Sequence, residues 1–142
     1  MKTVRQVLEG KKSGALSVAP GASVYDALKL MTEHDVGSLV VLDGDRLAGI
    51  FSERDYARKV ILFGKSSRET EVREIMTDKV LCVRPDATMK ECMTLMTEKR
   101  VRHLPVVDGK KVVGVISIGD AVKETIEDQQ QTIAQLEQYI AG

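Results

Sequence analysis

The strongest constraint on this chain is an internal repeat. Shifted by 65 residues, residues 18–57 align with residues 83–122 without a gap, and 15 of the 40 aligned positions are identical. A shorter echo precedes it, because TVRQVL at 3–8 resembles EVREIM at 71–76, with three extra residues before the first long copy. A repeat of roughly 60 residues is one supersecondary unit that needs its neighbour to bury an apolar face. The sequence therefore predicts a duplicated unit.

Within each copy the hydrophobic pattern changes in a fixed order. A short apolar strand at 15–18 or 80–83 leads through a proline to Ser23 or Thr88, which are residue types that cap helices. The helix that follows has apolar side chains at the i, i+3, i+4, i+7 spacing of a buried face. Two strands joined at Asp-Gly come next, a strong signal for a two-residue hairpin. A second helix follows, so an α/β fold with the order strand, helix, strand, strand, helix is predicted twice.

Composition excludes several classes of partner. The 142 residues are 43% hydrophobic, which is enough for one compact core. The 21 basic and 21 acidic residues cancel and are interspersed, so neither nucleic acid nor an anionic membrane is an expected partner. No apolar run reaches the roughly 20 residues of a membrane span, and no signal peptide is recognised. Cys82 and Cys92 lack metal-ligand spacing and are predicted to be buried thiols, which favours the reducing cytoplasm and no metal site.

The most informative polar motif lies where the last strand of each copy becomes a helix. The strand ends in GIFSERD in one copy and GVISIGD in the other, which places Ser52 three residues before Asp55 and Ser117 three residues before Asp120. One interpretation is a capping box, in which serine and acid satisfy the first amides of the helix. The other is a nucleotide site, in which the helix start and the serine favour a phosphate and the carboxylate accepts from the two hydroxyls of a ribose. The motif alone leaves both open.

With the hairpin ending in Gly-x-x-Ser-x-x-Asp and the stretch RHLPVVD at 102–108, the repeat order resembles a tandem pair of CBS domains over almost the whole chain. The resemblance implies two repeats packed about a pseudo-twofold axis, with two clefts that take AMP, ADP or ATP and, in some members, NAD or S-adenosylmethionine. It also implies that Asp55 and Asp120 hold ribose hydroxyls and that no metal is required.

Other contacts are implied by the resemblance alone. The polar position of the first strand, which reaches the base in the family, falls on Ser17 and on Cys82, which has no hydroxyl. Only the second copy supplies cations at the start of its second strand, and Arg54 has Gly119 as its counterpart, so unequal clefts are expected. Whether Arg102 serves its own repeat's cleft or the opposite one is left open. The full expected nucleotide-binding set is Ser17, Val18, Val36, Gly37, Ser38, Ser52, Arg54, Asp55, Cys82, Val83, Val101, Arg102, His103, Pro105, Ser117 and Asp120.

The last helix is expected to continue to the end of the chain. Its apolar seam includes Ile133, Leu136 and Ile140 and is interrupted at Gln129, which predicts either a self-association helix or one that folds back on its own module. Since CBS pairs commonly form discs of two modules, the resemblance implies a homodimer. The expected divisions are 1–69 for the first repeat, 70–124 for the second and 125–142 for the extension.

Three functions are compared. A regulatory module would bind an adenine nucleotide and signal to a partner protein that the sequence does not identify. An enzyme is not expected, because the two histidines have no serine or cysteine at catalytic spacing and no metal motif appears. A structural adaptor with vestigial clefts is the alternative.

Overall fold

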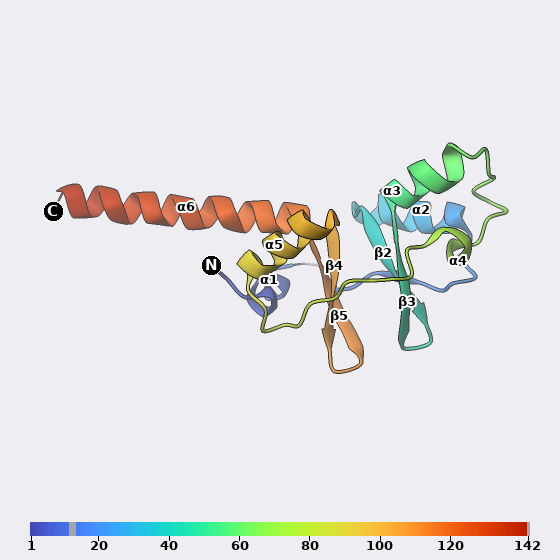
Figure 1. Ribbon diagram of the computed structural model, residues 1–142, viewed down its shortest axis with the longest axis horizontal. Helices are drawn as coiled ribbons and strands as arrows, with labels where there is room; N and C mark the ends of the chain where they lie inside the picture. Colours follow the sequence, from blue (N-terminus) through green and yellow to red (C-terminus); the bar gives the residue numbers. More distant parts are fainter. Residues whose placement is uncertain (12–13, 142) are drawn as a thin grey trace.

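The computed structural model describes residues 1–11 and 14–141 (Figure 1). The two repeats form two small sheets with helices beside them, and each sheet is built around one hairpin. The first repeat contains strand β1 (Ser17–Val18), helix α2 (Val24–His34), strands β2 (Ser38–Asp43) and β3 (Arg46–Ser52), helix α3 (Glu53–Tyr56) and a π-helix over Ala57–Ile61. The second contains helix α5 (Met89–Lys99), strands β4 (His103–Asp108) and β5 (Lys111–Ser117) and helix α6 (Ile118–Ala141).

The two hairpins are near-copies of each other and stand side by side in Figure 1. Ser38 is registered with Ser52 in one and His103 with Ser117 in the other, and each register shifts at the same place before the turn. Gly44 and Gly109 occupy the turns with φ of 63° and 65°, which is the left-handed conformation a two-residue hairpin turn requires. The predicted hairpins are confirmed.

The first strand of each repeat is shorter than predicted. In the first copy only Ser17 and Val18 pair with β2. In the second copy the predicted strand at 80–83 is reduced to one bridge from Val83 to Val106, so this expectation was wrong. Cys82, next to this single bridge, is exposed rather than buried. Cys92 is buried as predicted, and burial raises the pKa of its thiol to about 11.

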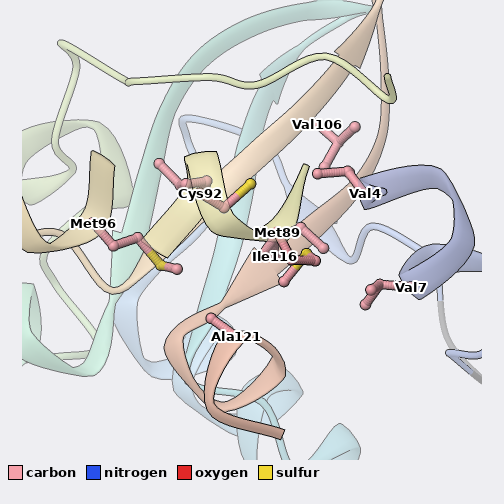
Figure 2. Packing of buried hydrophobic residues seen from close by; sticks show 9 residues of the cluster. Val4, Val7, Met89, Cys92, Met96, Val106, Ile116 and Ala121 are labelled. Carbon is pink, nitrogen blue, oxygen red and sulfur yellow. The ribbon is translucent and has the colours of Figure 1, made fainter. Parts of the chain in front are cut away.

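The N-terminal helix packs into the core of the second repeat. Helix α1 (Val4–Glu9) buries Val4 and Val7 against residues of α5, β4, β5 and α6 (Figure 2). The backbone joins in, because the Val4 amide donates to the Ala87 carbonyl at 2.8 Å and the Met89 amide to the Lys2 carbonyl at 2.9 Å. The two ends of the chain therefore share one core.

The helix that precedes the second repeat packs into the first core in the same manner. Helix α4 (Val72–Ile75) buries Val72 and Ile75 against α2, β2 and β3. The Val72 amide donates to the Ala22 carbonyl at 2.8 Å, and the Val24 amide to the Thr70 carbonyl at 2.9 Å. The predicted division at 69/70 stays a prediction, but the packing crosses it, because each short helix completes the other repeat.

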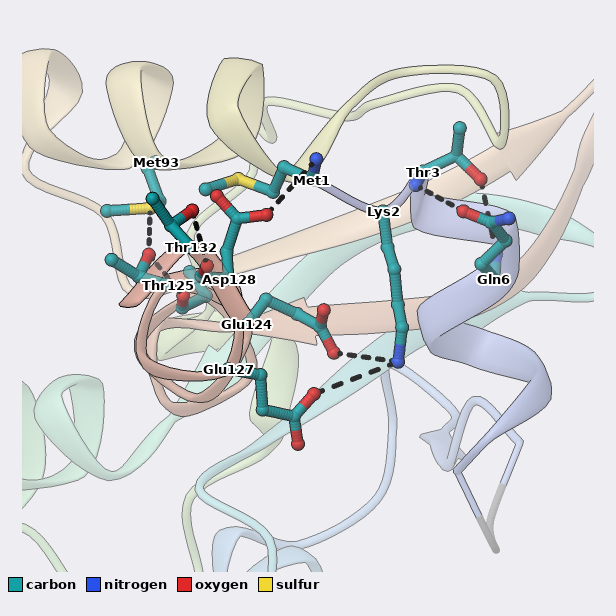
Figure 3. A network of polar contacts seen from close by, with 11 residues as sticks. Met1, Lys2, Thr3, Gln6, Met93, Glu124, Thr125, Glu127, Asp128 and Thr132 are labelled. Carbon is teal, nitrogen blue, oxygen red and sulfur yellow. Dashed lines mark hydrogen bonds and ion pairs between the residues drawn. The ribbon is translucent and has the colours of Figure 1, made fainter. Parts of the chain in front are cut away.

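The last helix, α6, begins in the second core and then projects beyond the rest of the chain (Figure 1). Its first turns are fixed by buried Ala121 and by Glu124, whose carboxylate lies 3.4 Å from the ammonium of Lys2 (Figure 3). Residues 129–141 are all exposed, so the described chain does not fold back over the predicted seam.

Candidate functional site

Both Ser-Asp motifs stand at helix starts and form caps. The Asp55 amide donates to Ser52 Oγ at 3.2 Å, and the Ser52 amide donates to Asp55 Oδ2 at 3.0 Å. In the second repeat the same two bonds measure 3.2 Å and 2.8 Å between Ser117 and Asp120. The capping-box interpretation is therefore confirmed, and any ligand contact comes in addition to it.

The other oxygen of Asp55 is also engaged. Oδ1 accepts a hydrogen bond from the Thr77 hydroxyl at 3.1 Å and lies 3.1 Å from the ammonium of Lys59. Thr77 belongs to the segment after α4, which pairs with β3 through Ile50. Asp55 is buried, and with its Ser52 contacts its acceptor sites are filled.

Asp120 is less fully engaged. Its Oδ2 accepts from the Ser117 amide and lies 2.8 Å from the ammonium of Lys11, which also donates to the Val115 carbonyl at 3.0 Å. No residue in the described part of the chain donates to Oδ1. Burial tends to raise the pKa of the Asp120 carboxyl, but the bonds from Lys11 and Ser117 outweigh it and hold the pKa below its ordinary value of 3.8.

Each Ser-Asp motif lines a cavity, and the larger of these two cavities, which lies between the repeats, has a volume of about 520 Å³. It combines Ser52 and Asp55 of the first repeat with Arg102 and His103 of the second, so Arg102 lines the cavity that holds the opposite repeat's motif. A cavity of this size is typical of small-molecule sites. Its lining is Gly37, Ile50, Ser52, Glu53, Arg54, Asp55, Arg58, Lys59, Thr77, Lys79, Val80, Leu81, Arg100, Val101, Arg102, His103 and Ile118.

The smaller cavity, of about 340 Å³, holds the other Ser-Asp motif. Gly37 and His103 line both cavities and form part of the wall between them. A Cβ at Gly37 would come within 3.3 Å of His103 Nε2, which shows how closely the two approach. The lining is Leu8, Lys11, Gly14, Ala15, Leu16, His34, Asp35, Val36, Gly37, Ser38, His103, Val115, Ser117 and Asp120.

His103 is held in its neutral form. Burial lowers the pKa of its imidazole most, the positive charges of Lys11 and Arg102 lower it further, and only Asp120 opposes them. The pKa of His103 therefore lies below its ordinary value of 6.5. At neutral pH this side chain offers one donor and one acceptor to either cavity.

Eleven of the sixteen expected site residues line one or both cavities. Those that line neither cavity are Ser17, Val18, Cys82, Val83 and Pro105. The residues immediately before the expected positions Ser17 and Cys82 line the cavities instead, Leu16 the smaller and Leu81 the larger. Apolar side chains thus stand where the family resemblance implied a polar contact to the base.

Sequence reasoning missed most of the positive charge of the larger cavity. Lys59 could have been noticed, since it stands four residues after Asp55 on one helical face. Arg100 had no local signal: it is the C-cap of α5, with a left-handed φ of 54°, and it lines the larger cavity. The missed cations are Lys11 in the smaller cavity and Arg58, Lys59, Lys79 and Arg100 in the larger one.

The duplicated fold and the paired Ser-Asp clefts are those of a CBS domain pair, and comparison with known families agrees. The CBS domain model matches residues 4–61 and again residues 72–127. The chain therefore belongs to the CBS domain family, as a tandem pair.

The chain is similar to several known CBS-domain proteins. The mitochondrial CBS domain-containing protein CBSX3 of Arabidopsis thaliana is 40% identical over 149 residues, which cover 99% of this chain and 72% of that protein. The solved structure of a CBS-domain protein from Burkholderia ambifaria MC40-6 is 54% identical, covers 90% of this chain and 96% of its own, and gives a TM-score of 0.85. The CBS pair of protein MJ0100, solved with 5′-methylthioadenosine and S-adenosyl-L-methionine, is 23% identical over 90% of this chain and 98% of its own, and its TM-score of 0.79 shows the shared fold.

Two further observations concern membranes and metals. Within residues 1–11 and 14–141, no helix combines the length and the apolar character that crossing a bilayer requires. The same residues contain no group of three or more His, Cys, Asp or Glu side chains arranged to hold a metal ion.

Proposed function

We propose that this CBS pair is a regulatory module that binds an adenine nucleotide, AMP, ADP or ATP, with NAD and S-adenosylmethionine as further candidate ligands. The single observation that carries the proposal is the larger cavity, where Ser52 and Asp55 face Arg102 and His103 across the repeat interface. The MJ0100 pair holds adenosine derivatives on the same fold. The module has no proposed catalytic role.

Phosphate recognition is supported by the six Arg and Lys residues that line that cavity. Arg54 is already oriented from the first turn of α3, where its Nη1 donates to the Arg100 carbonyl at 3.2 Å. Guanidinium groups bind phosphate oxygens with two parallel bonds. The phosphates would therefore lie between Arg54, Arg100 and Arg102.

Ribose recognition requires one local exchange. Asp55 has no vacant acceptor site while Lys59 is paired with it. Lys59 lies four residues after Asp55 and its side chain is 44% exposed, so its ammonium has room to move away. A ribose diol can replace that ammonium at Oδ1, and Lys59 can then turn to the phosphates. The Asp55 carboxylate would then accept from the ribose and the Lys59 ammonium would donate to a phosphate, so each charged group keeps a charge-assisted hydrogen bond.

Calorimetric titration of the nucleotide-stripped protein with AMP, ADP, ATP, NAD and S-adenosylmethionine tests the proposal. Arg102→Ala should weaken phosphorylated ligands about tenfold or more, because a hydrogen bond to a charged group is lost. The matched control Arg84→Ala removes an exposed arginine outside both cavities and should change nothing. Asp55→Asn should weaken every ligand that carries a ribose diol.

Absence of binding by all five ligands would overturn the proposal and favour a structural adaptor whose clefts are vestigial. In either case we propose a homodimer and a regulated partner protein, with the exposed seam of α6 as the added contact between copies. A cytoplasmic location stays a prediction.

A further inference from the structure

The two repeats place opposite charges at one equivalent position. Asp35 and Arg100 are 65 residues apart, and each is the C-cap of its helix in the left-handed conformation, with φ of 51° and 54°. Asp35 lines the smaller cavity and Arg100 the larger. The duplication has therefore produced one backbone site that carries an acid in one cavity and a cation in the other.

The same sorting holds at the neighbouring positions. Arg102 lines the larger cavity, while its repeat counterpart Gly37 brings no charge to the smaller one. Arg54 lines the larger cavity, and its counterpart Gly119 lines neither. Among the described lining residues, six Arg and Lys face two acids in the larger cavity, Glu53 and Asp55.

In the smaller cavity the described lining contains one lysine and two acids. The charge of Lys11 is neutralised where it stands, since its ammonium lies 2.8 Å from Asp120 Oδ2. Asp35 is exposed, and among the described lining residues its carboxylate is left as the net charge. The Oδ1 atom of Asp120, to which no described residue donates, is an acceptor suited to a ribose hydroxyl.

We infer that the cavities are sorted by charge: the larger takes the polyphosphate of a nucleotide, and the smaller takes a nucleoside without phosphate. This inference rests on the proposed function and assigns a ligand class to each site. A polyphosphate brought to the smaller cavity meets Asp35 with like charge, while an uncharged nucleoside pays no such cost. The smaller cavity thus excludes a polyphosphate by repulsion, and the larger cavity selects it by attraction.

The test exchanges the two residues that differ. Full-length protein is titrated with ATP and with adenosine as wild type, as Asp35→Arg and as Arg100→Asp. In each case the equivalent position of the other repeat already holds the incoming residue type in the left-handed conformation, so the substitutions suit the fold. The matched controls make the same changes of charge at exposed sites outside the cavities, Asp45→Arg and Arg84→Asp, and circular dichroism with thermal melting checks folding.

The wild type is expected to bind one equivalent of ATP, and to bind adenosine with an affinity that Asp120→Asn reduces. Asp35→Arg should add a second ATP site, Arg100→Asp should weaken ATP about tenfold or more, and the controls should do neither. Two equal ATP sites in the wild type, or no second site in Asp35→Arg, would overturn the sorting while leaving nucleotide binding intact. Failure of both ATP and adenosine to bind any variant would overturn the sorting, and failure of AMP, ADP, NAD and S-adenosylmethionine to bind as well would overturn the proposed function.

Discussion

Gly49 of β3 lies directly under the Thr77 carbonyl, so close that a Cβ built on Gly49 would stand 2.7 Å from that oxygen. Thr77 cannot retreat easily, because its amide and carbonyl both bond to Ile50 at 2.9 Å. The glycine is what lets the segment after α4 cross the sheet of the first repeat.

Gly49→Ala is therefore expected to destabilise the protein by about 1–3 kcal/mol, as overpacked cores do. The equivalent Gly114→Ala should cost less, because the nearest atom there, at 2.6 Å, is the end of the flexible Leu8 side chain. Urea unfolding of both variants measures the difference. Equal losses would contradict the distinction between a fixed backbone and a movable side chain.

The exchange of α1 and α4 between the cores predicts where a cavity mutation is felt. Val72→Ala removes a fully buried side chain from the first core, although Val72 follows that repeat in sequence, and should cost about 1.5–3 kcal/mol. In native-state hydrogen exchange, the amides of β2 and β3 should show the largest increase in exchange rate relative to the wild type. Val113→Ala, at a partly exposed site of β5, is the control and should be close to neutral. An increase in exchange rate confined to β4 and β5 would contradict the observed packing.

His103 predicts a pH dependence of stability. Its folded pKa lies below the ordinary 6.5, so the unfolded state takes up a proton first as the pH falls. The free energy of unfolding should be level above about pH 6.5 and should decline below it, down to the folded pKa. His103→Gln should remove this part of the decline in denaturant titrations from pH 7.5 to 5.5. Asp120, whose pKa is lowered from 3.8, contributes its own loss only at more acidic pH.

The exposed seam of α6 predicts the state of association. Ile126, Ile133, Leu136 and Ile140 stand at heptad spacing with isoleucine at a and leucine at d, a pattern that favours paired helices. Ile133→Lys with Leu136→Lys should weaken the dimer and raise the fraction of monomer in light scattering at micromolar concentration. Gln135→Lys with Gln138→Lys, on the other face, should leave the dimer unchanged. A wild-type monomer at these concentrations would remove α6 as a dimer contact.

Much of this fold could be predicted because its signals are local. The Asp-Gly turns, the helix caps at Ser23 and Thr88 and the Ser-Asp boxes depend on neighbouring residues, and the structure contains them all. The partners of α1 and α4 could not be predicted, since the echo between 3–8 and 71–76 shows that the helices are equivalent but not which core each completes.

The candidate site was predicted in part for the same reason. Ser52, Asp55, Ser117 and Asp120 sit in a motif, whereas Lys11 reaches its carboxylate from 109 residues away. The lining positions Leu16 and Leu81 depend on how far a two-residue strand extends, which hydrophobic alternation does not define over so short a run.

The shared core of α1 also orders events during synthesis. The first core needs nothing beyond α4, so it can close once residue 76 has left the ribosome. The valines of α1 precede the first core in the chain but must wait for residues 89–121, which are made after that core. A nascent chain released between these two points carries a finished first half with an apolar helix still seeking its partner, which is the species a chaperone would meet.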